Sequence, residues 1–287
     1  MTSLLTQARN NFHQHLVRSG TLSFASGIAS NADSSQATSR FIANTIATEL
    51  RAGDAEKKLS GQRAGAQFEA AVESFLKESF PLVAPALRPG EWTIENLGGS
   101  RSEYQIAQYE PYVHLDTLAM AIRQNQTLAA VLGNSYEISP DVLVLRSPVS
   151  DEVINCTGSV VDENVAKRAI IRAANQDRKI VHAIVSCKWT LRSDRAQNAR
   201  SEALNMIRNR KGRTPHIAVV TAEPTPSRLA SLALGTGDID MVYHFALPEL
   251  IAAVQASGND EAEILLGILL DGERLRDIAD LPLDLAV

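Results

Sequence analysis

IVHAIVSCKWTLRSDRAQNARSEALNMIRNRKG, residues 180–212, contains two different periodicities in succession. Its first part, 180–191, is a largely apolar run that favours a buried strand. The second part favours a helix, because Ser193 or Asp194 can cap its start and Gly212 can end it. Apolar residues recur along one side of this helix at positions 196, 199, 203, 206 and 207. A strand that leads directly into an amphipathic helix is a unit of an α/β fold.

Apolar runs elsewhere in the chain extend this pattern. Further short strands are expected at 141–145, 217–221 and 241–245. Helices are expected, from apolar residues at helical spacing, at 41–51, 67–80, 114–132, 247–257 and 260–270. Strands that alternate with helices predict an α/β domain whose central sheet is packed by helices.

The composition is that of a globular protein. The chain has 287 residues, of which 45% are hydrophobic and 21% charged, and no long Pro- or Gly-rich linker divides it. We therefore expect one domain over residues 1–287. Residues 23–40, SFASGIASNADSSQATSR, are rich in Ser, Ala and Asn without apolar periodicity, so they are predicted to form a mobile loop.

Several classes of protein are disfavoured. The N-terminal residues mix charged, amide and apolar side chains too evenly for a signal peptide, and no stretch approaches the roughly 20 apolar residues of a membrane helix. Two cysteines, Cys156 and Cys187, cannot form a disulfide framework, so a cytoplasmic location is expected. No glycine-rich loop with lysine, HExxH motif or paired CxxC motif is present, and no nucleotide cofactor is expected.

Charge is distributed unevenly along the chain. The formal net charge is -5, which by itself disfavours a nucleic-acid partner. Between Lys188 and Arg213, however, eight basic residues stand against two acids, which gives this segment +6 and leaves -11 for the rest. The basic segment is either a solvated helix face or a surface that meets DNA.

The sequence VSCK at 185–188 lies in the strand of the quoted segment. Because side chains alternate along a strand, Ser186 and Lys188 share one face and Cys187 points to the other. The dipeptide Pro140-Asp141 precedes another predicted strand. If the two strands adjoin, a carboxylate and an ammonium group meet at one edge of the sheet.

Such a pair suits metal-assisted hydrolysis of a phosphodiester. Asp141 would bind Mg²⁺, a hard cation that prefers oxygen, with the Cys187 carbonyl as a second ligand, and Lys188 would stabilise charge or orient the attacking water. Glu202, one helix later, can return toward the same edge, whereas Glu69 beside its apolar helix stripe is by default a solvated acid. The structural alternative is a turn dipeptide and an edge lysine that faces solvent.

The segment Arg192-Ser-Asp-Arg195 joins the lysine strand to the basic helix. Loops before helix N-termini are natural places to approach DNA. Arginine recognises guanine with two hydrogen bonds and aspartate accepts from cytosine N4, so two arginines around an aspartate suit adjacent G·C pairs. An N-capping aspartate with ion-paired arginines explains the same spacing without DNA.

Longer segments of the chain resemble one family, the NgoMIV-type restriction endonucleases of the PD-(D/E)XK nuclease superfamily. The resemblance is densest in SCKWTLRSDRAQNARSEALN (186–205), RNRKGRTPHIAVVTAEPTPSR (208–228), LGTGDIDMVYHFAL (234–247) and DLPLDLAV (280–287). Earlier segments that share it are SNADSS (30–35), GQRAGAQFEA (61–70) and PDVLV (140–144). It implies a central mixed sheet flanked by helices, with a restriction-endonuclease-like catalytic core at 140–247.

The resemblance also implies roles for individual residues. Asp141 would ligate Mg²⁺ with help from the Cys187 carbonyl, and Lys188 would be the catalytic lysine. Ser186 stands where the wider superfamily usually has an acid. Glu202 would supply that carboxylate, and with Glu69 it would complete the acidic shell.

DNA recognition is implied in the same way. Arg192, Asp194 and Arg195 would read a central CCGG in the major groove. The residues implied for the rest of the site are Ser35 and Arg228 at the outer G·C pair and Gln62 from the minor-groove side, with 23–40 as a DNA-contacting region. The resemblance further implies a tetramer of two back-to-back dimers. Each dimer would cut GCCGGC in double-stranded DNA after its first G and leave four-base 5′ overhangs.

Two other functions remain open at this point. One is a DNA-binding protein without catalysis, in which Asp141 and Lys188 form a structural ion pair. The other is a different metal-dependent nuclease, such as a repair enzyme or a junction resolvase. A palindromic substrate favours the restriction enzyme as a twofold assembly, because a dimer is the simplest reader of the same bases presented twice.

Overall fold

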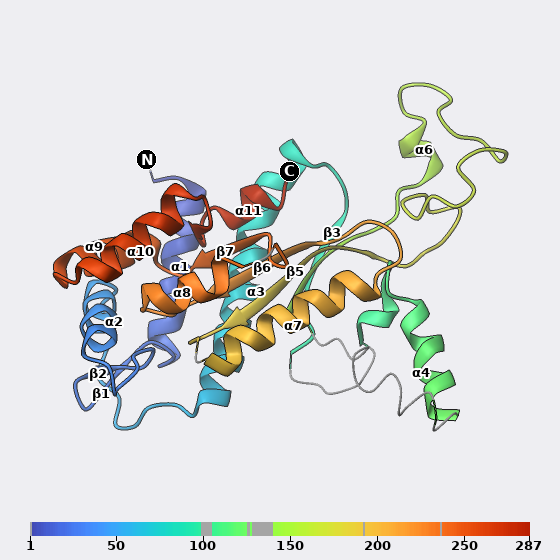
Figure 1. Cartoon of the computed structure of the whole chain (residues 1–287). Coiled ribbons are helices and arrows are strands. Elements are labelled where there is room, and N and C mark those ends of the chain that lie inside the picture. The colour runs from blue at the N-terminus through green and yellow to red at the C-terminus, as the bar shows by residue number, and fades with distance from the viewer. Residues whose placement is uncertain (1, 99–104, 125–126, 128–139, 192, 236) are drawn as a thin grey trace.

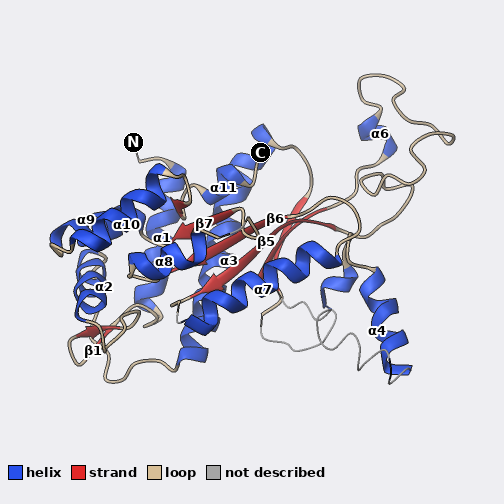
Figure 2. Ribbon diagram, in the orientation of Figure 1, coloured by secondary structure: helices blue, strands red, loops and turns tan. Residues whose placement is uncertain are grey.

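The protein is built, in a computed structural model, around a six-stranded sheet (Figures 1 and 2). The structure describes residues 2–98, 105–124, 127, 140–191, 193–235 and 237–287. The strand order is β3-β4-β5-β6-β7-β8. Strand β4 runs antiparallel to both β3 and β5, whereas β5 to β8 run parallel to one another. The predicted α/β class with a central mixed sheet flanked by helices is therefore confirmed.

The elements have the following bounds. The strands of the sheet are β3 Trp92–Asn96, β4 Val142–Arg146, β5 Ile180–Lys188, β6 His216–Thr221, β7 Met241–His244 and β8 Leu275–Asp277, and a separate hairpin consists of β1 Phe24–Ala25 and β2 Ile28–Ala29. The helices are α1 Leu4–Arg18, α2 Ala37–Glu49, α3 Gly61–Leu87, η1 Gln105–Gln108, α4 His114–Gln124, α6 Asp151–Ile154, α7 Ser193–Asn209, α8 Pro226–Ala233, α9 Leu247–Ala256, α10 Asp260–Asp271 and α11 Leu281–Asp284. Within the described ranges, no helix is long and apolar enough to cross a membrane.

Helices cover both faces of the sheet. In Figure 1, α7 and α8 lie in front of the strands, and α3 lies behind them and packs against α1. The buried side of α3 includes the stripe that its sequence predicted, Phe68, Val72, Phe75 and Leu76. The buried residues that α7 contributes to the core are Ala199, Ala203 and Met206. The amphipathic patterns of both helices therefore identified the faces that meet the sheet.

The predicted loop at 23–40 is partly wrong. The hairpin β1–β2 lies inside it, and α2 begins at Ala37 rather than near residue 41. Ser30 and Asn31 are buried, where the Ser30 hydroxyl donates to the Thr21 carbonyl at 2.5 Å and the Asn31 amide donates to the Ala222 carbonyl at 2.9 Å. Side chain to backbone bonds give this segment its order, and a search for apolar periodicity does not detect them.

Other boundaries also differ from the prediction. Strand β5 ends at Lys188 rather than at Leu191, and α3 is longer than 67–80 at both ends. The helix predicted at 114–132 begins at His114 as expected, but its predicted end falls on residues outside the described ones. The elements that the sequence pattern did not predict are α1, β1, β2, β3, η1, α6, α8, β8 and α11.

The sheet gathers several strand ends at one edge. Because β4 is antiparallel to β5, Val142 at the start of β4 pairs with Val185 near the end of β5. Lys188 pairs with Thr221 of β6, and Thr221 pairs with His244 of β7. We call this side of the sheet, which carries Asp141, Lys188 and Thr221, the carboxyl edge.

The opposite end of the sheet carries a long excursion. Residues 147–179 connect β4 to β5, include the short helix α6, and project away from the body of the protein in Figure 1. Arg172 holds the excursion together, since its guanidinium bonds to Asp151 at 2.7 Å and to the Asp162 carbonyl at 2.6 Å. The excursion therefore has defined internal contacts although it lies outside the sheet.

Candidate active site

Asp141 and Lys188 meet at the carboxyl edge. Asp141 Oδ2 accepts a hydrogen bond from the Cys187 backbone N–H at 2.7 Å, and Lys188 Nζ lies 3.3 Å from the same oxygen. The cause is local, because antiparallel pairing puts the residue before β4 beside the last residues of β5. The predicted juxtaposition of a carboxylate and an ammonium group is thus present in the structure.

Helix α7 returns a second carboxylate to the same place. Glu202 Oε2 lies 3.3 Å from Lys188 Nζ and accepts a hydrogen bond from the Ser186 hydroxyl at 3.3 Å. Ser186 and Lys188 both contact Glu202 and so share the strand face that meets α7, as the alternation predicted. Burial, followed by the charge of Asp141, raises the pKa of Glu202 against the opposing effect of Lys188.

Glu69 of α3 approaches from the other face of the sheet. Its pKa is raised to about 7, first by burial and then by the negative charge of Asp141, with Glu202 adding to the effect. Burial alone would lower the pKa of Lys188, but the charges of Asp141 and Glu202 outweigh it and raise the pKa. Glu69 is therefore not the solvated acid that its position beside the helix stripe suggests, and three carboxylates share one ammonium group.

This group of residues fits a hard divalent cation. Oxygen ligands dominate it, and a cation would relieve the repulsion that raises the pKa of Glu69 and of Glu202. In the described part of the chain, no three His, Cys, Asp or Glu side chains are close enough to form a closed metal cage. Mg²⁺ rarely uses such a cage, since it usually binds one or two carboxylates together with waters and substrate phosphate oxygens.

The predicted readers of the central bases lie outside the description. Arg192 itself, and the side chains of Asp194 and Arg195, are outside the described residues. The backbone of the last two belongs to the first turn of α7, which begins at Ser193. That turn follows Lys188 by only a few residues, so it starts beside the carboxyl edge.

The structure brings Ser35 and Arg228 together through a residue that the sequence did not single out. Asp33 Oδ1 accepts a hydrogen bond from the Ser35 hydroxyl at 2.6 Å, and Asp33 Oδ2 pairs with the Arg228 guanidinium. Hydrogen bonds from Ser35, then from Arg228, hold the pKa of Asp33 well below its usual range. Gln62 lies apart from this pair, exposed in the first turn of α3.

A polar pocket of about 400 Å³ connects these residues to the carboxyl edge. Its wall includes Asp33, Arg228 and the α3 N-terminal residue Gly61, together with Trp189, which follows Lys188. The indole N–H of Trp189 and the side-chain oxygen of Asn31 are buried without a protein partner among the described residues. The predicted reader Arg228 and its partner Asp33 therefore belong to a hollow that begins next to Lys188.

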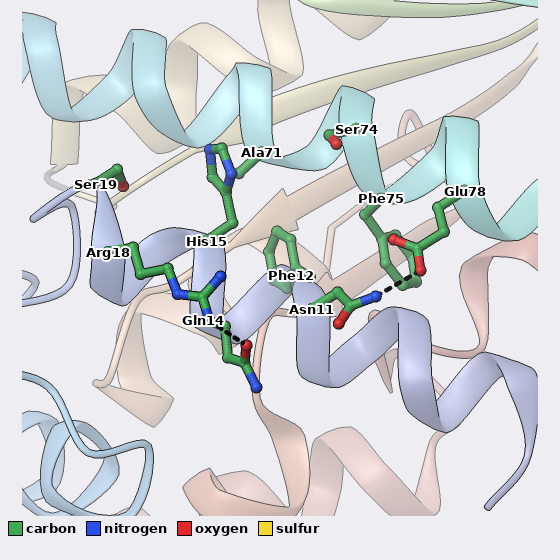
Figure 3. A pocket seen from close by; sticks show the side chains of 10 residues that line it. All are labelled: Asn11, Phe12, Gln14, His15, Arg18, Ser19, Ala71, Ser74, Phe75 and Glu78. Carbon is green, nitrogen blue, oxygen red and sulfur yellow. Dashed lines mark hydrogen bonds between the residues drawn. The ribbon is translucent and has the colours of Figure 1, made fainter.

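A second pocket, of about 410 Å³, is unrelated to this site. It lies between α1 and α3 and is lined by His15, Arg18 and Glu78, among others (Figure 3). Figure 3 also shows Asn11 donating to Glu78, a bond of 2.7 Å. None of the predicted site residues lines this pocket, so its size alone does not make it part of the active site.

Glu223 is a further residue that the sequence analysis missed. It follows β6 at the carboxyl edge, is fully buried, and accepts backbone hydrogen bonds from Leu191 at 2.8 Å and Thr225 at 3.1 Å. An acid within VVTAEPTP was a detectable anomaly, because charged residues are rarely buried unless they are paired. One of its partners, Leu191, lies far away in the chain, so no local pattern indicates what Glu223 binds.

Comparison with known proteins agrees with this geometry. The family model described as NgoMIV restriction enzyme matches residues 12–287. The chain is also 49% identical to the type II restriction enzyme NgoMIV of Neisseria gonorrhoeae over 288 aligned positions, which cover 100% of both chains. All of the residues assembled at the carboxyl edge lie within the matched range, and the chain belongs to the NgoMIV restriction enzyme family.

Proposed function

We propose that this chain is a Mg²⁺-dependent type II restriction endonuclease that recognises GCCGGC in double-stranded DNA and cuts each strand after the first G. As a member of its family the chain is a restriction endonuclease, an enzyme that cuts DNA site-specifically. The metal, the sequence of the site and the position of the cut are the parts that we propose. The observation that carries the proposal is the convergence of Asp141, Glu202 and Lys188 at 3.3 Å contacts on one sheet edge.

The residues of the carboxyl edge support a hydrolytic mechanism. Asp141 is held through Oδ2 by the Cys187 N–H, which leaves Oδ1 to face a metal ion. Asp141, with the Cys187 carbonyl, would hold Mg²⁺, which when bound polarises the scissile phosphate and activates water, and Glu202 and Glu69 would complete the acidic shell around it. Lys188 stays protonated because its pKa is raised, so its charge can stabilise the phosphate as negative charge builds up. Water adds to phosphorus, the bond to the 3′ oxygen breaks, and a 5′-phosphate and a 3′-hydroxyl result.

Base recognition would use two regions on the same edge. Arg192, Asp194 and Arg195 would read the central CCGG from the segment that starts α7. Ser35 and Arg228 would read the outer G·C pair, and their connection through Asp33 supports a common task. Gln62, exposed at the start of α3, would approach from the minor-groove side.

We also propose that the protein forms a symmetric assembly and is located in the cytoplasm. Two cuts in a palindrome need two active sites, so we propose a dimer on each site and a back-to-back pair of dimers as the full enzyme. The excursion offers a surface for contacts away from the DNA, since Val153, Val160 and Val165 are exposed on it. Sedimentation velocity of the full chain tests the tetramer, which a monodisperse dimer would exclude.

Cleavage of plasmid DNA tests the catalytic assignment. With Mg²⁺ the chain should give fragments whose ends map to GCCGGC with four-base 5′ overhangs, and EDTA should stop the reaction. Asp141→Asn should abolish cleavage and retain or improve binding of a GCCGGC duplex. Binding without cleavage by the unaltered chain would instead mean a non-catalytic DNA-binding protein, and random ends would mean a different nuclease.

Substitution of Arg192 tests the recognition assignment. We expect Arg192→Ala to cost on the order of 1–3 kcal/mol and to relax discrimination at one base pair of the central CCGG. The measurement is kcat/KM on duplexes that differ from GCCGGC at single positions. An equal loss on all of these duplexes would place Arg192 on phosphate rather than on a base.

A further inference from the structure

Glu223 connects two regions that are far apart in the sequence. Its Oε2 accepts from the Leu191 N–H at 2.8 Å, and Leu191 directly precedes Arg192. Its Oε1 accepts from the Thr225 N–H at 3.1 Å, in the turn that leads to α8 and Arg228. One carboxylate therefore fixes the backbone on both sides of the polar pocket.

The same carboxylate also faces the Arg228 guanidinium. Arg228 Nη1 lies 3.7 Å from Glu223 Oε2, while Arg228 Nη2 pairs with Asp33, which in turn accepts from Ser35. The result is a continuous chain of contacts from Ser35 through Asp33, Arg228 and Glu223 to the Leu191 backbone.

A charged group in this position is costly. Glu223 is fully buried, and burial raises its pKa against the hydrogen bonds from Leu191 and Thr225. A neutral side chain would avoid the desolvation cost, whereas a carboxylate can accept with both oxygens and attract an arginine at the same time. In Glu223→Gln the amide would offer a single accepting oxygen, so the variant would lose one of the two backbone bonds and the attraction for Arg228.

We propose that Glu223 is a positioning residue that couples reading of the outer base pair to reading of the central CCGG. The inference rests on the proposed function, because it takes Arg228 and Arg192 as the two readers. Through Glu223, a displacement of Arg228 at an incorrect outer pair is transmitted to the backbone of Leu191, which directly precedes Arg192 in the sequence.

Cleavage kinetics of Glu223→Gln test the coupling. The measurement is kcat/KM on GCCGGC, on duplexes with a changed outer pair and on duplexes with a changed central pair. Discrimination is the ratio of kcat/KM on GCCGGC to that on a changed duplex. We expect this ratio to fall by about tenfold at both kinds of position, which is about 1.4 kcal/mol each. Arg228→Ala, by contrast, should relax the outer pair more than the central one.

Glu249→Gln provides a matched control, since Glu249 is another buried acid, hydrogen-bonded to Arg9 away from the DNA-facing residues. It should lower the melting temperature without changing discrimination. The inference fails if Glu223→Gln lowers kcat/KM equally on all duplexes, or relaxes the outer pair alone. If Glu223→Gln does not fold, Glu223→Asp, which keeps the charge on a shorter side chain, is put through the same comparison. An unaltered chain that does not discriminate among these duplexes would contradict the proposed function itself.

Three arginines at the opposite end of the sheet form a second, independent feature. Arg88 follows α3, Arg146 ends β4 and Arg213 precedes β6, and together they line a pocket of about 250 Å³. The apolar part of its wall includes Ile171 and Val181. Since Ile180, Val181 and His182 of β5 line this pocket, roughly 20–26 Å separates it from Lys188 at the other end of the strand.

Among the described residues, none of these arginines forms an ion pair with an Asp or Glu side chain. Arg88 donates to the main-chain oxygen of Val287, the last residue of the described chain. Arg146 donates to the Pro89 carbonyl at 3.0 Å, and its Cζ lies 5.5 Å from the centroid of the Trp92 ring. The Nε atoms of Arg88 and Arg146 are buried without an acceptor in that part of the chain. Burial, followed by the charges of Arg213 and Arg146, lowers the pKa of Arg88.

We infer that this pocket binds an oxyanion, a phosphate or a carboxylate carried on an apolar body. Guanidinium groups match the planar geometry of such anions, and the buried Nε atoms are donors that lack an acceptor among the described residues. The pocket is remote from the catalytic edge, so it is a site separate from that for the scissile DNA.

Thermal unfolding with inorganic phosphate tests this site. The protein is the Asp141→Asn variant bound to its duplex, which keeps phosphate away from the DNA-binding residues. Phosphate should raise the melting temperature more than chloride does at equal ionic strength. The double variant Arg88→Gln, Arg146→Gln should lose this increase, and the control Arg274→Gln, at an exposed arginine, should keep it.

The same measurement can overturn the inference. An increase that survives in the double variant, or one no larger than that from chloride, would mean an adventitious ion only. Benzoate in place of phosphate distinguishes the two anion classes, because its apolar ring suits the isoleucine and valine wall. A larger shift with benzoate would identify a carboxylate ligand, and a larger shift with phosphate a phosphate ligand.

Discussion

Two groups of charged residues in this protein differ in how their charges are balanced. The first, the catalytic group, is Asp141, Lys188, Glu202 and Glu69. The second, the anchoring group, is Arg9 with Glu249 and Asp277, and it ties α1 to α9 and β8. Arg9 makes four hydrogen bonds to the two acids, between 2.6 and 3.0 Å.

Carboxylate pKa values reveal the difference. In the anchoring group, the bonds and charge of Arg9 outweigh burial and lower the pKa of Glu249. In the catalytic group, burial and neighbouring acids raise the pKa of Glu69 and of Glu202. The carboxylate of Glu249 is satisfied by the protein itself, whereas the group that we propose as catalytic keeps an excess of negative charge that a further cation or protonation would neutralise.

Lys188→Met should have the largest effect. Loss of the ammonium group should reduce kcat by on the order of 10²–10³, because no other cationic side chain contacts the acids of this group among the described residues. Stability should fall less than in Arg9→Met, since the Glu202 side chain is 38% exposed and can be hydrated or protonated. Single-turnover cleavage and urea unfolding measure the two effects, and near-normal cleavage would remove Lys188 from the mechanism.

Arg9→Met should show the opposite pattern. It leaves Glu249 and Asp277, whose side chains are 10% and 13% exposed, without a cation, at a cost of about 3 kcal/mol of unfolding free energy. Cleavage at a temperature where the variant is folded should stay within a few-fold of the unaltered chain. A large catalytic defect in the folded variant would mean that the anchoring group also serves the active site.

Glu69→Gln should distinguish the catalytic group from the anchoring group through the pH dependence of its unfolding free energy. Since the folded pKa of Glu69 is about 7 and thus above its unfolded value, ionisation of Glu69 destabilises the fold as pH rises through this range. Without divalent metal, Glu69→Gln should therefore be more stable than the unaltered chain at pH 8, by on the order of 1 kcal/mol after solvent screening. At pH 4 the difference should disappear.

Glu249→Gln should show the reverse dependence, because its folded pKa is lowered and its contribution is lost as pH falls. Urea midpoints at both pH values measure both variants. If the effect of both substitutions on stability changed in the same direction with pH, the distinction between the two groups would be contradicted.

Ser186→Ala should have the smallest effect. The serine hydroxyl makes a long, 3.3 Å hydrogen bond to Glu202, so its loss should cost about 0.5–1 kcal/mol and a few-fold in rate. A loss as large as that of Lys188→Met would give the hydroxyl a direct role in the reaction. The conservative variant Ser186→Thr, which keeps a hydroxyl, should retain most of the rate.

Local patterns predicted the centre of the fold and of the site. The alternation along 185–188 correctly separated Lys188 from Cys187, and the apolar stripe of 193–212 correctly predicted a helix, although α7 already includes Ser193 and ends at Asn209 rather than near Gly212. Together they placed Asp141 and Lys188 at one edge, because only the pairing of two strands was needed. The roles of these residues and of the DNA readers remain predictions.

Features that depend on distant contacts were missed. Glu223 meets Leu191, 32 residues earlier, and Arg228 meets Asp33 across 195 residues, so no local periodicity relates them. Strand β8 has only three residues, too few for an alternating pattern. Helix α1 did carry a signal, since Ala8, Phe12 and Leu16 recur every four residues and are buried.

The excursion at 147–179 has a practical consequence for measurements on the intact chain. Cys156 is exposed on it, whereas Cys187 is buried and its thiol pKa is raised, so a maleimide dye should react at one position. The label would sit at the end of the sheet farthest from Lys188. Fluorescence could then follow encounter and release of single DNA molecules without any engineered attachment point.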